Sequence, residues 1–361
     1  MRQGCGPTGL GDPVYLKIHV IIRRLQQQTA TSRRAFLSGL LSSGAALALG
    51  GCAGIAESAT RPDASALATN PTMLVATTRR PVNGGRANPW YGSERGSTMS
   101  IARAKFTPPD YGRFSFASVG MSDWRLDAIE PAPGQVADLL AQAGGSGPDL
   151  LIYVHGFRQT FETAALDAAR LSDSIKFRGE TMVFSWPSKA GLFDYAYDRE
   201  SAVWSRDAFE RVLASAMASP TTGRVHIVAH SMGTMLALES LRQVYGRYGG
   251  AAVDRIGAVV FASPDIDLDV FSSSIARLRP IAHKITVISA TNDRALALSS
   301  RVAGGITRVG AAEKEALEKL GLRVVDASQY GWGIINHDLF LSNAEVRRVI
   351  RRAVDSGGIA G

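Results

Sequence analysis

The chain of 361 residues contains very little cysteine, with Cys5 and Cys52 as its only two. Everything beyond residue 52 therefore lacks a thiol. A folded body in that part of the chain can form no internal disulfide. It can also contain neither a thiolate metal site nor a cysteine nucleophile.

Long hydrophobic runs and a basic surface pattern are also missing. The apolar run between residues 39 and 49 is shorter than the roughly 20 residues that span a bilayer. The net charge is +8, but residues 1–51 hold six basic side chains against one acidic side chain. The rest of the chain is nearly balanced and shows no nucleic-acid-binding motif, so we expect no nucleic-acid partner. Its ordinary composition predicts a folded globular body.

The first fifty residues have the pattern of an export signal. Arg33 and Arg34 precede Phe36-Leu37 and the apolar run, and this order resembles a twin-arginine signal. Leu49-Gly50-Gly51-Cys52 resembles a bacterial lipobox, in which Cys52 would carry the lipid. We therefore expect an exported protein, periplasmic or at the cell surface, with a lipid anchor in the membrane. The expected divisions are a signal over 1–51, a tether over 52–71, a folded domain over 72–355 and a tail over 356–361.

Beyond the tether, short apolar runs alternate with amphipathic stretches. This alternation predicts a doubly wound, mostly parallel α/β sheet of about eight strands with helices on both faces. The segments 79–124 and 131–148 are rich in glycine and proline and predict loops, with one early hairpin at most. The predicted strands are Met73–Thr77, Phe114–Val119, Leu150–Val154, Thr181–Phe184, Val225–Ala229, Ile256–Phe261, Ile285–Ser289 and Leu322–Val325, and the predicted helices are Phe161–Ser174, Ala202–Ala218, Met232–Tyr245, Ala311–Leu320 and Ala344–Val354.

Ser231 stands where one of these strands turns into a helix, in Ala229-His230-Ser231-Met232-Gly233. This is the setting of a nucleophile elbow, although Ala229 replaces the first glycine of Gly-x-Ser-x-Gly. Such a turn raises the hydroxyl above the sheet edge. It also leaves the Met232 N–H free to donate to an oxyanion. Ser231 is therefore the predicted nucleophile, the alternative being a serine that only caps a helix.

A serine nucleophile needs a general base, and the chain has six histidines. His337 follows the last predicted strand and precedes the final helix, which is where a fold with this elbow places its base. The acid that orients it should lie between the two in the chain. Asp293 fits this order, and Asp265, which follows the preceding strand, is the alternative. Since the carboxyl ends of the strands face one crevice, these residues can meet there.

A second oxyanion donor is expected after the strand Leu150–Val154, which leads into His155-Gly156-Phe157. Gly156 allows an unusual backbone angle, so the Phe157 N–H can point towards the nucleophile. His155 precedes Ser231 in the chain and is expected to shape the loop rather than act as the base. Trp186, Tyr195, Tyr197 and Asp198 either line the substrate pocket or belong to the core, and residues 299–310 form either a mobile cover or a solvated loop.

Together, Tyr153–Phe157, Phe184-Ser185-Trp186-Pro187-Ser188, Ala229–Gly233 and Ser263-Pro264-Asp265 resemble a bacterial alpha/beta-hydrolase family of esterase/lipase type, long catalogued as a domain of unknown function. The resemblance covers about residues 72–355. It implies that Ser231 is the nucleophile, His337 the base and Asp293 the orienting acid. The resemblance implies little about the substrate. The chemistry of the predicted residues favours cleavage of a small-molecule or lipid ester, which needs no metal or cofactor. Amide, thioester or envelope-polymer cleavage, and a non-catalytic envelope-binding lipoprotein, are the alternatives.

Overall fold

The structure is a computed structural model that describes residues 65–110, 124–142, 147–189, 191, 193–330 and 337–357. The predicted signal, the predicted lipid site Cys52, most of the tether and the predicted strand Phe114–Val119 lie outside the described residues. Residues 60–361 form one unit. None of the helices in the described ranges is both long and apolar enough to cross a membrane.

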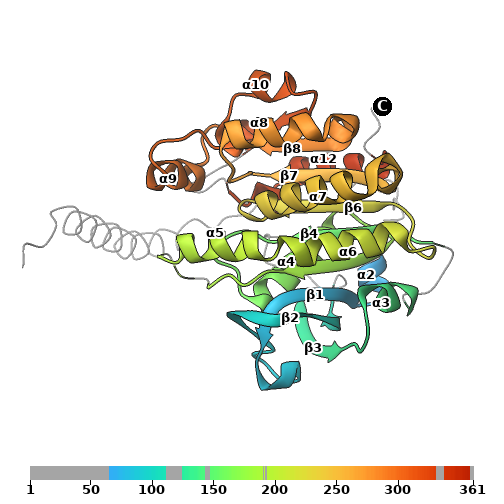
Figure 1. The fold of residues 1–361 in the computed structure, drawn as a ribbon. Coiled ribbons are helices and arrows are strands. Elements are labelled where there is room, and N and C mark those ends of the chain that lie inside the picture. Colours follow the sequence, from blue (N-terminus) through green and yellow to red (C-terminus); the bar gives the residue numbers. More distant parts are fainter. Residues whose placement is uncertain are drawn as a thin grey trace, which may run out of the picture. The chain divides into compact units, whose positions relative to one another are not determined.

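A nine-stranded sheet runs through the described part of this unit, in the order β3-β2-β1-β5-β4-β6-β7-β8-β9 (Figure 1). The seven strands from β1 to β9 in that order pair in parallel, whereas β2 and β3 continue the sheet beyond β1 with antiparallel pairing. The strands are β1 (Thr72–Pro81), β2 (Tyr91–Thr107), β3 (Arg125–Pro131), β4 (Leu150–Val154), β5 (Glu180–Ser185), β6 (Val225–His230), β7 (Ile256–Ala262), β8 (Ile285–Ser289) and β9 (Arg323–Asp326).

Helices cover both faces of the sheet (Figure 1). One face packs against side chains of α3 (Val136–Gln142), α5 (Tyr195–Trp204), α6 (Arg206–Ala218), α7 (Gly233–Asp254), α8 (Leu268–Arg277) and α10 (Lys314–Glu318). The other packs against α2 (Ala66–Thr69), α4 (Phe161–Ser174), α11 (Leu339–Ser342) and α12 (Ala344–Asp355). The remaining helix, α9 (Arg294–Val302), and the short 3-10 turns η1 (Asn83–Gly85), η3 (Arg279–Lys284), η4 (Val309–Ala311) and η5 (Ser328–Tyr330) connect these elements.

The two hydrophobic cores follow from the period of two along each strand. In β4, Ile152 and Val154 pack into the first core, whereas Leu151 and Tyr153 pack into the second. Every residue of β4 is buried, as expected of a central parallel strand covered on both faces. The side chains that build both cores lie between residues 67 and 354. Residues 60–361 thus form a compact unit with hydrophobic cores of its own.

The predicted fold class is confirmed, with nine strands in the described residues rather than about eight. The early hairpin predicted for 79–124 is present as the antiparallel pair of β1 and β2, but the segment contains less loop than expected, since β2 occupies 17 of its residues. Its buried residues alternate only over a short stretch, and glycines interrupt the rest, so the sequence signal is weak. The helix α3 likewise occupies part of the predicted connection 131–148. The body also begins before residue 72, because Leu67 of α2 packs into the second core.

The carboxyl ends of the parallel strands bring the sequence-predicted residues to one edge of the sheet. Ser231 follows β6, Asp265 follows β7, Asp293 follows β8 and Phe157 follows β4. His337 lies between β9 and α11. In an open α/β sheet this edge is where ligands bind.

Candidate active site

The turn after β6 holds Ser231 in a backbone conformation that residues other than glycine rarely adopt. Its φ angle is 51°, in the left-handed region. The Ser231 N–H donates to the carbonyl of Ala262 at 2.9 Å. Its own carbonyl accepts from Thr234 N–H at 3.0 Å and from Asp265 N–H at 3.3 Å. Three backbone hydrogen bonds therefore hold the strained backbone of Ser231 in place, and such strain is common at functional sites.

Gly233 explains why this turn needs small residues. A Cβ atom there would lie 2.2 Å from the carbonyl oxygen of His155, far inside van der Waals contact. Ala229, which stands in place of the first glycine of the motif, is fully buried in β6, and its methyl group belongs to the first core. The alanine is therefore compatible with the elbow, whereas the second glycine is required.

His337 lies between Ser231 and Asp293 and touches both. Its Nε2 is 2.8 Å from the Ser231 Oγ, and its Nδ1 is 2.8 Å from the Asp293 Oδ2. The other carboxylate oxygen of Asp293 accepts from the N–H groups of Ala295 and Leu296 and caps the helix α9. The capping fixes the carboxylate, and the carboxylate then fixes the ring.

The charges of this pair favour a protonated ring. Burial by itself would lower the pKa of His337, but its hydrogen bond and attraction to Asp293 outweigh burial and raise the pKa above the ordinary 6.5. Asp338 and Asp265 add to this rise. Burial would raise the pKa of Asp293, yet the contact with His337 brings it below the ordinary 3.8. Asp293 is therefore placed to stabilise an imidazolium at His337.

Asp265, the alternative acid, has a different set of partners. It is buried, and its Oδ1 lies 3.0 Å from the Nε of Arg308, whose side chain is also buried. Ser299 Oγ donates to the same oxygen at 2.6 Å, and the Tyr195 hydroxyl donates to Oδ2 at 3.0 Å. Among the described residues no hydrogen bond joins Asp265 to His337, and the aspartate that contacts the His337 ring is Asp293.

His230 holds the segment that carries His337. Its ring is buried, and Nε2 is 3.1 Å from the carbonyl oxygen of His337. The neutral tautomer with a proton on Nε2 donates this hydrogen bond. Burial, followed by repulsion from His337, lowers the pKa of His230 to about 4. His230 is therefore neutral near pH 7 and cannot itself serve as a strong base.

Two hydrogen bonds that Trp186 donates to His155 fix the loop after β4. The Trp186 indole N–H donates to the His155 carbonyl at 2.8 Å, and the Trp186 backbone N–H donates to His155 Nε2 at 3.1 Å. The rings stack with centroids 4.7 Å apart. Since the other ring nitrogen of His155 lies 2.8 Å from the carbonyl of Gly156, both nitrogens are occupied. His155 shapes the loop, and Trp186 is fully buried and does not line a pocket.

Gly156 brings this loop directly against the elbow. A Cβ atom on Gly156 would lie 2.8 Å from His230 Nδ1 and 3.0 Å from Ser231 Cβ. The next residue is Phe157, and the residue after Ser231 is Met232. Within the described ranges, the N–H groups of Phe157 and Met232 donate to no protein acceptor. Two such backbone donors, on the two segments that meet at Ser231, are what an oxyanion needs.

The aromatic and polar residues that follow β5 have separate positions. Tyr195 packs its ring against Phe157 at 5.6 Å and reaches Asp265 with its hydroxyl, so it borders the site. Tyr197 donates to the carbonyl of Ser93 on β2, away from Ser231. Asp198 is buried and accepts from the Lys189 N–H at 2.8 Å, where it holds the loop after β5.

Sequence patterns did not single out Arg308 or Ser299 as neighbours of the site. Both lie within the segment that we predicted to be a cover or a solvated loop, and α9 occupies its first part. The short-range signals there are weak, because a buried arginine cannot be told from an exposed one by its neighbours in the chain. Only the partnership with Asp265 identifies it.

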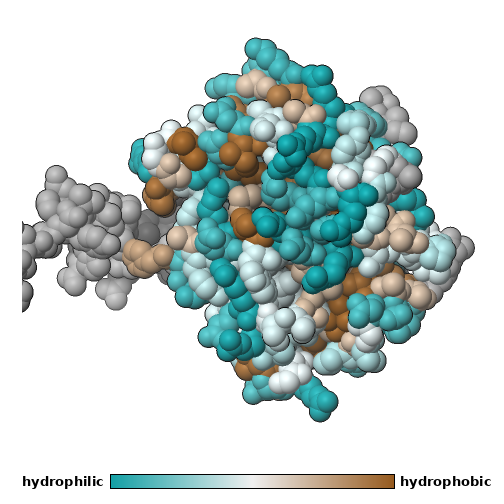
Figure 2. All heavy atoms as spheres, viewed as in Figure 1, coloured by the Kyte–Doolittle hydropathy of each residue, from teal (hydrophilic) through white to brown (hydrophobic). Residues whose placement is uncertain are grey.

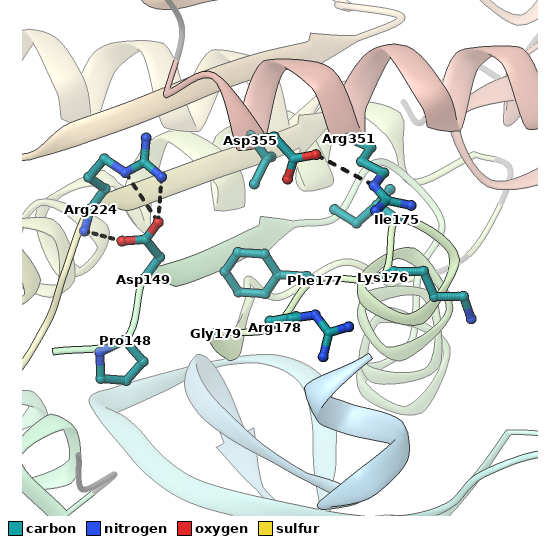
Figure 3. A pocket seen from close by; sticks show the side chains of 11 residues that line it. Pro148, Asp149, Ile175, Lys176, Phe177, Arg178, Gly179, Arg224, Arg351 and Asp355 are labelled. Atoms are coloured by element: carbon teal, nitrogen blue, oxygen red, sulfur yellow. Dashed lines mark hydrogen bonds and ion pairs between the residues drawn. The ribbon is translucent and has the colours of Figure 1, made fainter. Parts of the chain in front are cut away.

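A hollow of about 380 Å³ opens at the opposite edge of the sheet, where β4 and β6 begin (Figure 3). Its charged side chains include two close ion pairs, Arg224 with Asp149 at 2.9 Å and Arg351 with Asp355 at 3.5 Å. Within each pair the two charges neutralise each other, and we assign the hollow no function. Within the described ranges, no cluster of three metal-ligating side chains occurs.

The sheet, the elbow and the position of His337 define an alpha/beta hydrolase. Residues 136–353 match the family model described as alpha/beta hydrolase of unknown function (DUF900). The match covers more than half of the chain, and the chain belongs to this family. No curated protein matches the sequence.

Solved structures of esterases are similar to the chain at low identity. A cutinase of Trichoderma reesei, in complex with a phosphonate inhibitor, shares 12% identity over 62% of this chain and 88% of its own, with a TM-score of 0.31. A hyperthermophilic esterase of Pyrobaculum calidifontis shares 14% over 72% and 81%, with a TM-score of 0.32. A putative aryl esterase of Burkholderia cenocepacia shares 11% over 60% and 93%, with a TM-score of 0.34.

Proposed function

We propose that the protein is a serine hydrolase that cleaves carboxylic esters through an acyl-enzyme, with Ser231 as nucleophile, His337 as general base and Asp293 as the orienting acid. The observation that carries the proposal is the position of the His337 ring, whose two nitrogens lie 2.8 Å from the Ser231 hydroxyl and from the Asp293 carboxylate. This arrangement activates a hydroxyl that is otherwise a poor nucleophile.

In the first half of the reaction, Ser231 Oγ forms a bond to the carbonyl carbon of the ester while its proton moves to His337 Nε2. The negative charge that develops on the carbonyl oxygen is received by the N–H groups of Phe157 and Met232. Collapse of the tetrahedral species breaks the bond to the alcohol oxygen. The alcohol leaves with the proton from His337, and the acyl group stays on Ser231.

In the second half, water attacks the acyl carbon while His337 takes a proton from it. The bond to Ser231 Oγ then breaks, and His337 returns the proton to the serine. The products are the alcohol and a carboxylic acid, and the enzyme is regenerated. Asp293 keeps its negative charge throughout, because the imidazolium that forms twice at His337 is stabilised by it.

Hydrolysis of p-nitrophenyl esters with short to long acyl chains tests the proposal, using purified residues 60–361 and the Ser231→Ala variant. Removal of the serine should lower the rate by several orders of magnitude. Ser240→Ala is the matched control, since Ser240 is a buried serine of α7 bonded to the carbonyl of Leu236. Parallel assays on amides and thioesters define the acyl donor. If the folded protein hydrolyses none of these, the proposal is wrong and a binding role replaces it.

We further propose that the protein is exported and held at the cell envelope by a lipid on Cys52. The support is the order of twin arginines, short apolar run and lipobox in residues 33–52. Growth of a bacterial host with a labelled fatty acid should label the full chain, and Cys52→Ala should abolish the label. Cys5→Ala is the matched control, which should retain it. Equal labelling of the Cys52→Ala variant would contradict the anchor.

A further inference from the structure

Three of the six large hydrophobic side chains that the described residues expose belong to α9, which Asp293 caps, and to the segment before α5. Leu298 and Val302 of α9 are 61% and 67% exposed, and Phe193, before α5, is 82% exposed. Hydrophobic side chains gather over α9 in Figure 2. Exposing large apolar side chains to water costs free energy. An exposed apolar patch therefore indicates a surface that contacts another molecule or a membrane.

Hydrogen bonds connect this patch to the nucleophile. Ser299, the neighbour of Leu298, lies 3.0 Å from the hydroxyl of Tyr195, two residues after Phe193. Ser299 also donates to Asp265 at 2.6 Å, and the Asp265 N–H donates to the Ser231 carbonyl at 3.3 Å. Phe193 and Leu298 therefore flank the same contact, only a few side chains from Ser231.

The N-cap and the buried side of α9 fix the orientation of this helix. Asp293 caps its first turn, and Leu296 and Ser299 are buried. With this side fixed, Leu298 and Val302, which are four residues apart, stay on the exposed side together with Arg294 and Arg301. The apolar face is thus part of the surface while α9 keeps this orientation.

The two cations of this face have no counter-charge among the described residues. Arg294 and Arg301 are exposed, and neither forms an ion pair with a carboxylate of the described residues. Within α9 there is no acidic residue. An exposed apolar face flanked by arginines is the composition of helices that lie in the interface of an anionic bilayer.

We propose that α9 and Phe193 form a docking surface for an anionic phospholipid bilayer. Leu298, Val302 and Phe193 enter the boundary between headgroups and acyl chains, while Arg294 and Arg301 bind lipid phosphates. Docking turns the edge of the sheet that holds Ser231 towards the bilayer. The consequence for substrate, which rests on the proposed function, is that the site takes esters presented by a lipid surface in preference to dissolved ones.

Sedimentation of residues 60–361 with vesicles tests the docking, because the measurement does not depend on turnover. One set of vesicles is phosphatidylcholine alone, and the other is phosphatidylcholine mixed with phosphatidylglycerol. We expect binding to the mixed vesicles that weakens as salt is added. The double variant Leu298→Asp/Val302→Asp should bind the mixed vesicles with an affinity lower by about tenfold or more. Arg294→Gln and Arg301→Gln should each weaken binding by about fivefold.

Tyr248→Asp is the matched control, because Tyr248 is an exposed aromatic residue near the far end of α7. It should leave vesicle binding unchanged. The docking proposal is overturned if the native protein binds neither vesicle, or if the Leu298/Val302 double variant binds as tightly as the native protein. It is also overturned if the patch is covered by a second copy, which light scattering would show as a dimer that the same double variant dissociates.

Hydrolysis of a dissolved short-chain ester separates this proposal from the proposed function. The Leu298/Val302 double variant should retain this activity, since neither residue contacts the candidate catalytic groups, and should lose activity on an ester embedded in the mixed vesicles. Binding without any ester hydrolysis would contradict the enzymatic role and support the docking. Hydrolysis of both substrates at unchanged rates in the variant would contradict the docking and leave the enzymatic role in place.

Discussion

Asp265 and Arg308 form a buried ion pair at 3.0 Å beside the candidate active site, so this aspartate is paired with an arginine rather than with His337. With Arg308, Ser299 and Tyr195 around it, the Asp265 carboxylate is fully engaged. Asp293 faces His337 directly at 2.8 Å. Two aspartates in similar sequence settings thus have different tasks, and their substitutions should have different effects.

Asp293→Asn should lower kcat by about 10⁴-fold, because the amide no longer favours the ring tautomer that accepts the serine proton. Asp265→Asn should lower kcat by less than about tenfold in the folded enzyme. It should instead destabilise the fold by about 3–5 kcal/mol, since Arg308 is left buried without its counter-charge. Steady-state kinetics and denaturant unfolding of both variants measure this. A large kcat loss in Asp265→Asn with Asp293→Asn active would reverse the two assignments.

The pH dependence of kcat/KM should show an acid limb with a midpoint above 6.5. His337 must be neutral to accept the proton of Ser231, and Asp293 raises its pKa. Activity is therefore lost as the pH falls through that raised value. Asp338→Asn should move the midpoint to lower pH, since Asp338 contributes to the rise. Asp269→Asn, on α8, should leave it in place. An acid limb well below pH 6 would contradict the predicted environment of His337.

His230 should make the fold sensitive to acid. Its pKa is about 4 in the folded protein and near 6.5 in the unfolded chain, so the unfolded state binds a proton first. The stability that a neutral His230 contributes is fully present above pH 6.5. It decreases as the pH falls towards 4, by about 3 kcal/mol.

Denaturant unfolding between pH 7 and pH 4 measures the effect of His230→Phe. The slope of stability against pH should become shallower, with a remainder from His155 and His226, whose pKa values burial also lowers. The activity should also fall, because the hydrogen bond from Nε2 to the His337 carbonyl is lost. His283→Gln is the control, since His283 is exposed. An unchanged slope in His230→Phe would rule out a buried neutral His230.

The two small residues that flank Ser231 should tolerate substitution very differently. Gly233→Ala places a methyl group 2.2 Å from the His155 carbonyl oxygen, so the elbow must shift, and activity and stability should both fall sharply. Ala229→Gly removes a methyl group and should retain activity, with a stability loss of about 1 kcal/mol from the strand. Ester hydrolysis and thermal unfolding of both variants check this. An active, stable Gly233→Ala protein would contradict the geometry of the turn.

The central parallel strands could be predicted from the sequence because their residues are buried on both faces and form mostly apolar runs, as in β4 and β7. The antiparallel strand β2 could not be placed in detail, because only part of it is buried and its polar residues resemble those of a loop. Helices α8 and α9 were missed for a related reason. They are short, and their apolar residues are shared between the core and the surface.

For the candidate site, chain order and strand ends were sufficient to name Ser231, Asp293 and His337, because the sheet brings strand ends together wherever the loops are short. The roles of His230, Trp186 and Arg308 depend on contacts between residues 31 to 107 positions apart in the chain. Such contacts leave no periodic pattern in the sequence. Asp265 remained an alternative for the same reason, since its partner Arg308 is 43 residues away in the chain.

The central claim is that Ser231 is a nucleophile activated by His337. Reaction with a fluorophosphonate, followed by proteolysis and mass spectrometry of the peptides, tests it without reference to any substrate. We expect one adduct per chain, on Ser231, formed much more slowly in His337→Ala and absent from Ser231→Ala. A folded protein that forms no adduct, or that carries the adduct on another serine, would contradict the claim.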